Sequence, residues 1–173
     1  WYFLVVGVQA LTLSFPFSQA MSVTRREFYL GTLLTAALTA AILASVFVVG
    51  GFIEVATGGY GMDGYFFYID GLWDAGWWVA WLAYFTIAMF MFVAGFWAAT
   101  IYKRWGSVIL TIVLVAIGVI LVGIMWLIGR MNAWGQVFTW IGQQGPTGLT
   151  AWGLLLGAVL AAISFLTLRR AIP

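Results

Sequence analysis

The chain has 173 residues, of which 65% are hydrophobic and only 7% carry a charge, with a formal net charge of +2. A soluble domain carries about 25% charged residues, so this composition excludes a water-soluble protein and predicts that most side chains face lipid. Cysteine and histidine are both absent, which excludes disulfides, thiol chemistry and the usual zinc, haem and general-base residues.

Five apolar stretches are long enough to cross a bilayer, which takes about 20 residues of helix. The sequence therefore predicts an all-α, polytopic membrane helix bundle that forms a single transmembrane domain over residues 1–173. The chain begins at Trp1 directly in an apolar run, and we expect one more helix upstream, which makes six in the full protein. The predicted helices cover residues 1–17, 28–53, 76–101, 107–129 and 149–168.

The first connection, residues 18–27, is short and basic. Pro16 precedes it and is expected to end or kink the first helix, because proline lacks the backbone N–H. Thr24 and Glu27 have the Thr-x-x-Glu spacing of a capping box ahead of a long apolar run. The connection is either a basic turn that sets membrane orientation, closed by a helix cap, or a docking element for a cytoplasmic partner.

Small residues repeat at four-residue spacing in the second and fifth helices. Such spacing gives a flat helix face on which another helix can approach closely. The pattern predicts helix packing within the subunit, and a seam between two subunits is the alternative. The stripe residues are Thr32, Ala36, Ala40 and Ala44 in the second helix and Gly153, Gly157 and Ala161 in the fifth.

The second connection, residues 54–75, is acidic and rich in glycine, and its acids do not match the spacing of an EF-hand calcium loop. Tryptophans gather near this connection, at Trp73, Trp77, Trp78 and Trp81. We interpret them as part of an aromatic belt at the outer interface rather than as a ligand-stacking cage.

The basic residues predict the orientation, because cytoplasmic loops are enriched in lysine and arginine. With five spans, residues 18–27, the tight turn 102–106 and the C-terminus fall on one side, and these regions hold six of the seven basic residues. Only Arg130, in the polar connection 130–148, falls opposite, together with most of the acids. Residues 18–27, residues 102–106 and the C-terminus with Arg169 and Arg170 are therefore predicted to be cytoplasmic.

Residues 15–31 have a distinctive order: Phe-Pro-Phe-Ser-Gln-Ala-Met-Ser-Val-Thr-Arg-Arg-Glu-Phe-Tyr-Leu-Gly. An apolar helix here runs into Val-Thr-Arg-Arg-x-Phe-Tyr-x-Gly and then into the next helix. This stretch resembles the corresponding region of bacterial ABC-2 type permeases, the transmembrane subunits of ABC transporters. Ser22 stands where that family usually has glycine.

The resemblance implies a six-helix subunit of the bacterial plasma membrane with both termini cytoplasmic. It also implies that the loop at residues 18–27 contacts a separate ABC ATPase, which binds ATP and Mg²⁺. The family pairs as a homodimer or heterodimer and usually exports its substrate. A short re-entrant or interfacial helix is expected at residues 134–144. The implied ATPase-coupling segment consists of Ser22, Val23, Thr24, Arg25, Arg26 and Glu27.

The chain itself is not predicted to be an enzyme. It has no Gly-x-x-x-x-Gly-Lys-Ser/Thr loop for ATP phosphates, no histidine for a catalytic triad, and no predicted cofactor or metal. Its charge distribution does not predict a nucleic-acid partner. Two alternatives to transport stay open. One is a non-catalytic membrane anchor or assembly subunit of a larger complex, and the other is a lipid-modifying enzyme, for which converging polar residues are too few.

Overall fold

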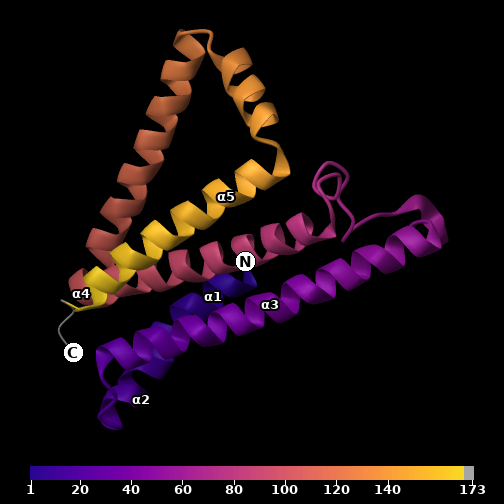
Figure 1. Cartoon of the computed structure of the whole chain (residues 1–173). Helices are drawn as coiled ribbons and strands as arrows, with labels where there is room; N and C mark the ends of the chain where they lie inside the picture. The colour runs from indigo at the N-terminus through magenta and orange to yellow at the C-terminus, as the bar shows by residue number, and fades with distance from the viewer. Residues whose placement is uncertain (170–173) are drawn as a thin grey trace.

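The computed structural model describes residues 1–169, and within this range every regular element is helical (Figure 1). The all-α prediction is confirmed. Arg170 and the C-terminal end, for which the sequence predicts a cytoplasmic position, lie outside the described residues. In chain order the elements are α1 (Tyr2–Gln9), the π-helix η1 (Ala10–Ser14), α2 (Phe15–Ala20), α3 (Arg25–Thr57), the π-helix η2 (Gly59–Asp63), α4 (Trp77–Arg130) and α5 (Trp134–Arg169).

Four helices are long and apolar enough to cross a membrane, where the sequence predicts five spans. The difference arises because two predicted spans, 76–101 and 107–129, lie within the single 54-residue helix α4. At 1.5 Å per residue, 54 residues extend about 81 Å, far more than the roughly 30 Å of a bilayer core. The four membrane-compatible helices are Tyr2–Ala20, Arg25–Thr57, Trp77–Arg130 and Trp134–Leu168.

Helix α4 breaks at Gly106, whose φ of 84° suits glycine and few other residues. The predicted turn at residues 102–106 is wrong in extent, because the helix continues through Trp105 and only Gly106 departs from helical geometry. The break divides α4 into an α4 stem, residues 77–105, and an α4 arm, residues 107–130. The arm diverges from the stem (Figure 1), and no residue between 102 and 130 is buried.

Helix α5 breaks in the same way at Gly145, with φ of 60°, immediately before Pro146. Proline is well tolerated at the first position of a new helical segment, where no N–H is needed. The short helix expected at residues 134–144 of the connection 130–148 is present, between a turn at residues 131–133 and the break at Gly145. Beyond the break, α5 runs beside the α4 stem (Figure 1).

The first membrane-compatible segment continues to Ala20, three residues beyond the predicted end. Pro16 lies at the start of α2, directly after η1. A π-helical turn widens the helix locally and shifts its hydrogen-bond pattern, so the helix tolerates the backbone N–H that proline lacks. The helix is thus continued rather than ended at this proline.

The tightest contact in the core joins α1 to the α4 stem through two glycines. A Cβ atom on Gly7 would overlap the backbone oxygen of Phe92, and a Cβ atom on Gly95 would overlap the backbone oxygen of Leu4. Only glycine allows two helix backbones to come this close. The contact lies within the main apolar core, which includes the fully buried Leu11 and Phe96.

Candidate functional site

The predicted coupling segment is a tight turn that leads directly into α3. Ser22 has a positive φ of 60°, and α3 begins at Arg25. Residues 21–24 form the whole connection, so the predicted ten-residue connection 18–27 is shortened at both ends by helix. The Gln19 side-chain amide donates to the backbone oxygen of Val23 at 3.1 Å, which closes the turn from the α2 side.

Thr24 and Glu27 form the predicted capping box. The Glu27 backbone N–H donates to Thr24 Oγ1 at 3.3 Å, and the Thr24 backbone N–H donates to Glu27 Oε2 at 3.0 Å. The Thr24 hydroxyl also donates to Glu27 Oε2 at 2.8 Å. These bonds satisfy donors at the start of α3 that would otherwise lack a partner.

Replacing Thr24 with Ala removes this cap and is expected to destabilise the protein by about 1 kcal/mol. The loss can be measured as a lower midpoint of unfolding in detergent, followed by tryptophan fluorescence. Thr139→Ala is the matched control, because the exposed Thr139 hydroxyl lies within α5 and donates back to Gly135. An equal or larger loss at Thr139 would contradict the assignment of the cap.

Basic side chains gather toward the same end of the molecule as the turn. The first turn of α3 carries Arg25 and Arg26, and the end of the α4 stem carries Lys103 and Arg104 (Figure 1). The Arg104 guanidinium carbon lies 4.2 Å from the ring centroid of Trp105, a cation–π contact. A second such contact, Arg130 with Trp126 at 5.2 Å, lies at the far end of the α4 arm.

Beneath the turn, an aromatic cluster connects four helices. Phe28 and Tyr29 follow the capping box directly on α3. The Phe28 ring lies 5.2 Å from Phe15 of α2, and the Tyr29 ring lies 5.5 Å from Phe96 of α4 and 5.2 Å from Phe165 of α5. Phe28 and Tyr29 are buried. A displacement of the start of α3 would therefore shift the packed rings on α2, α4 and α5.

The small-residue stripes lie at contacts within the chain. Ala36, Ala40 and Ala44 are buried, the last two completely. In α5, Gly153 faces the Thr86 methyl group, where a Cβ atom would come within 3.0 Å, and Gly157 faces Phe90. The backbone oxygen of Ala161 accepts a 2.7 Å hydrogen bond from the Tyr29 hydroxyl. Thr32, also in the predicted stripe, is only partly buried.

At the opposite end, Glu54 organises the predicted outer loop. Helix α3 continues to Thr57, so Glu54 is within it rather than in the connection, and its side chain is fully buried. Its Oε1 accepts from the backbone N–H of Phe66 at 3.0 Å, and its Oε2 accepts from those of Phe67 and Tyr68 at 2.8 and 2.7 Å. Three N–H dipoles stabilise the charge of a carboxylate that is removed from solvent.

Aromatic side chains hold the same loop against α3 and α4. Phe67 packs on Gly50, where a Cβ atom would come within 2.6 Å of its ring, and Trp73 packs on Gly51. The Tyr84 hydroxyl donates to the backbone oxygen of Phe67 at 2.6 Å. We name residues 64–76, which the Glu54 carboxylate and these rings secure, the flap.

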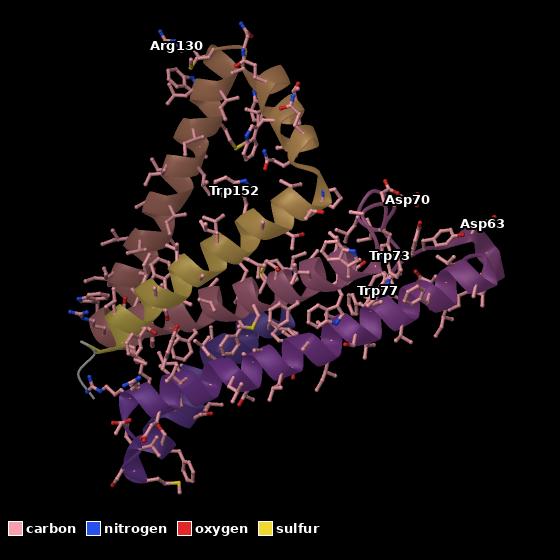
Figure 2. All side chains as sticks on the ribbon, in the orientation of Figure 1. Asp63, Asp70, Trp73, Trp77, Arg130 and Trp152 are labelled. Carbon is pink, nitrogen blue, oxygen red and sulfur yellow. The ribbon has the colours of Figure 1, made fainter. Side chains whose placement is uncertain are left out.

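Figure 2 shows Asp63 and Asp70 at the flap end of the molecule, with Trp73 and Trp77 near them. Arg130 lies apart from them, at the far end of the α4 arm. Within residues 1–169, no three acidic side chains come together in a way that would hold a metal ion. The acids at this end therefore do not cluster among the described residues, and the Glu54 carboxylate bonds to backbone N–H groups.

A groove of about 620 Å³ separates α1 and η1 from α3. Its walls combine aromatic rings, among them Phe3 and Phe92, with an unusual number of polar side chains for this chain. Ligand sites commonly have this volume and this mixture of apolar walls and few polar groups. The polar side chains that line the α1–α3 groove are Gln9, Ser14, Glu27, Thr32, Thr35 and Thr39.

Sequence reasoning missed this groove, although the spacing of Thr32, Thr35 and Thr39 places the three residues on one face of a helix. The four-residue spacing instead predicts Thr32 as part of the packing stripe, because small residues can either pack against a neighbouring helix or line a groove. Comparison of the chain with protein-family models, with curated proteins and with solved structures found no match in any of the three.

Proposed function

We propose that the chain is the transmembrane subunit of an ABC-2 type transporter, most simply an exporter of the bacterial plasma membrane. The observation that carries the proposal is the position of residues 22–27. The stretch that resembles the family forms a capped turn at the basic end, and Phe28 and Tyr29 join its base to α2, α4 and α5. A coupling element needs this combination of an accessible surface and a rigid base.

In this proposal, two ATPase subunits dock on residues 22–27 of two permease subunits and bind ATP and Mg²⁺ themselves. Arg25 and Arg26 supply charge for contacts with the ATPase. ATP binding brings the ATPases together, and the movement passes through the aromatic cluster into the helices. Packed cores move between discrete arrangements rather than bending continuously, which gives alternating access to the two sides of the membrane.

The α1–α3 groove supports an amphiphilic cargo. The Thr35 and Thr39 hydroxyls donate to backbone oxygens within α3, so the polar demand of the groove comes chiefly from Gln9. Gln9 lies within a membrane-compatible helix, where an exposed amide is costly unless it meets a polar partner. A cargo with both apolar and hydrogen-bonding parts satisfies the rings and this amide. The α4 arm, which has no buried residue, is a candidate surface for the second permease subunit.

The alternative is a non-catalytic membrane anchor or assembly subunit of a larger complex. The same exposed α4 arm favours it, because an apolar helix of about 36 Å with no buried residue suits attachment to other membrane subunits. Cation–π pairs near both ends, at Trp105 and Trp126, anchor such a helix at two interfaces. An anchor needs no ATPase at residues 22–27.

Affinity purification of the full-length protein from its native membrane, in mild detergent, tests the proposal. We expect a soluble ATPase to co-purify, and the double substitution Arg25→Glu and Arg26→Glu to remove it. Lys103→Glu with Arg104→Glu is the matched control, because it reverses two charges at the same end outside the coupling segment. ATPase recovery that is equal in both double variants, or absent from the wild type, would favour the anchor.

A further inference from the structure

A second groove, between α3 and α5, connects the basic end with the middle of the bundle. It consists of two hollows of about 340 and 440 Å³. Both hollows are lined by Leu33 and Ala161, so they adjoin along the two helices. The first hollow begins at Arg26 and the second reaches Gly153, beside Thr86. We call the pair the α3–α5 groove.

The groove exists because α5 packs on the α4 stem and makes few contacts with α3. Glycine contributes to the space, since Gly157 has no side chain and a Cβ atom there would lie 4.0 Å from Phe90, at ordinary contact distance. The floor comes from α4 through Phe85, Met89 and Phe90.

The two ends of the α3–α5 groove differ in chemistry. Among the residues whose side chains the structure describes, 1–168, Arg26 is the only charged residue that lines either hollow, and its side chain is exposed. The polar groups farther in are already bonded within the chain: the Tyr29 hydroxyl donates to Ala161, and the Thr86 hydroxyl donates to Leu82 at 2.7 Å. The inner groove therefore presents only apolar surface to an occupant.

This arrangement matches one class of molecule, a chain of hydrocarbon with an anionic head. From Arg26 to Ala37 the α3 side of the groove rises about 16 Å, a length that an extended acyl chain can follow. A free phosphate would leave the apolar part uncovered, and a purely apolar occupant would gain nothing from Arg26. Arginine binds phosphate oxygens through paired N–H groups, which favours a phosphate head.

We propose that the α3–α5 groove binds an anionic phospholipid, with the phosphate at Arg26 and one acyl chain along Leu33 toward Gly157. The bound lipid fills the space between α3 and α5 and completes the packing that these helices do not make with each other. The site shares Arg26 with the proposed coupling segment, but it stands apart from the α1–α3 groove and is measured on the purified protein without an ATPase, so the two proposals can fail separately.

Native mass spectrometry of the purified full-length protein tests the site. The protein is delipidated in detergent and mixed with phosphatidylglycerol or phosphatidylethanolamine, and the lipid-bound fraction is counted. Arg26→Gln removes the charge at the mouth, and Arg104→Gln is its matched control, a lost cation at the same end outside the groove. Ala158→Phe fills the inner groove, and Val159→Phe, on the exposed side of α5, is its control.

We expect the wild type to retain phosphatidylglycerol over phosphatidylethanolamine. Arg26→Gln should weaken phosphatidylglycerol binding about fivefold and reduce the preference for phosphatidylglycerol over phosphatidylethanolamine. Ala158→Phe should weaken binding of both lipids. Both control variants should bind the lipids as the wild type does. Equal retention of the two lipids, or unchanged binding in Arg26→Gln and Ala158→Phe, overturns the proposal. Dissociation of a dimer by Ala158→Phe with unchanged lipid binding also overturns it, because the groove is then an interface between copies.

Discussion

Gly95→Ala is expected to destabilise the protein, although alanine is intrinsically a better helix former than glycine by about 1 kcal/mol. The added Cβ atom would overlap the backbone of Leu4, and backbone atoms cannot rotate away as a side chain can. Overpacking of a core typically costs about 1–3 kcal/mol. Overlap with backbone places this contact at the upper end of that range, so the net loss after the helix gain is about 2 kcal/mol, which lowers the melting temperature of a chain of this size by about 4–8 °C.

The same substitution at Gly118 is the matched control. Gly118 also lies within α4, but in the α4 arm, where a Cβ atom would meet nothing within 4 Å. Gly118→Ala should leave the melting temperature unchanged or raise it slightly. Circular dichroism of both variants in the same detergent gives the comparison. Equal melting temperatures for Gly95→Ala and the wild type would show that α1 does not cross the α4 stem in this way.

Glu54→Gln is expected to release the flap. The amide group retains one oxygen acceptor but replaces the other with a donor that faces backbone N–H groups, so at least one buried N–H loses its partner. A buried donor without a partner costs about 1–3 kcal/mol, and the loss of the charge weakens the remaining bonds. A cost of about 3 kcal/mol raises the open population of the flap roughly a hundredfold.

Hydrogen–deuterium exchange with peptic digestion measures this opening at residues 64–76. The core amides of α3 and the α4 stem should keep their protection, because the flap can open without unfolding them. Asp70→Asn is the matched control: the same chemical change at an exposed acid of the same flap, with no expected effect. Slow exchange of residues 66–68 in Glu54→Gln would contradict the role assigned to the buried carboxylate.

Composition and local pattern were sufficient to predict the helical class and the capping box. Apolar runs of about 20 residues are unambiguous in a chain with so few charges, and Thr24 and Glu27 are three residues apart, so their hydrogen bonds are local. The positions of helix breaks were harder to predict. Gly106 and Gly145 are two of 21 glycines, and propensity does not distinguish those that adopt a positive φ from those that stay helical.

The features that position the helices depend on contacts between residues distant in the sequence. Gly7 and Gly95 stand 88 positions apart, and although Gly95 and Ala99 have four-residue spacing, that spacing does not identify α1 as the partner. The sequence predicts Glu54 as the first residue of the connection 54–75, yet its partners are backbone groups at residues 66–68 that any amino acids would supply. The sequence did contain a signal for this role, because a single carboxylate within an apolar helix is costly to bury unless hydrogen bonds or an opposite charge stabilise it.

The central claim is that the turn at the basic end contacts an ATPase, and site-specific photo-crosslinking in living cells tests it most directly. A benzophenone amino acid replaces Met21, which is exposed beside the coupling segment, and in a second strain replaces Met62, which is exposed at the flap end. We predict a crosslink from position 21, and not from position 62, to a soluble protein that carries a Gly-x-x-x-x-Gly-Lys-Ser/Thr loop. Crosslinks from position 21 that contain only lipid or other membrane subunits would contradict the claim and support the anchor.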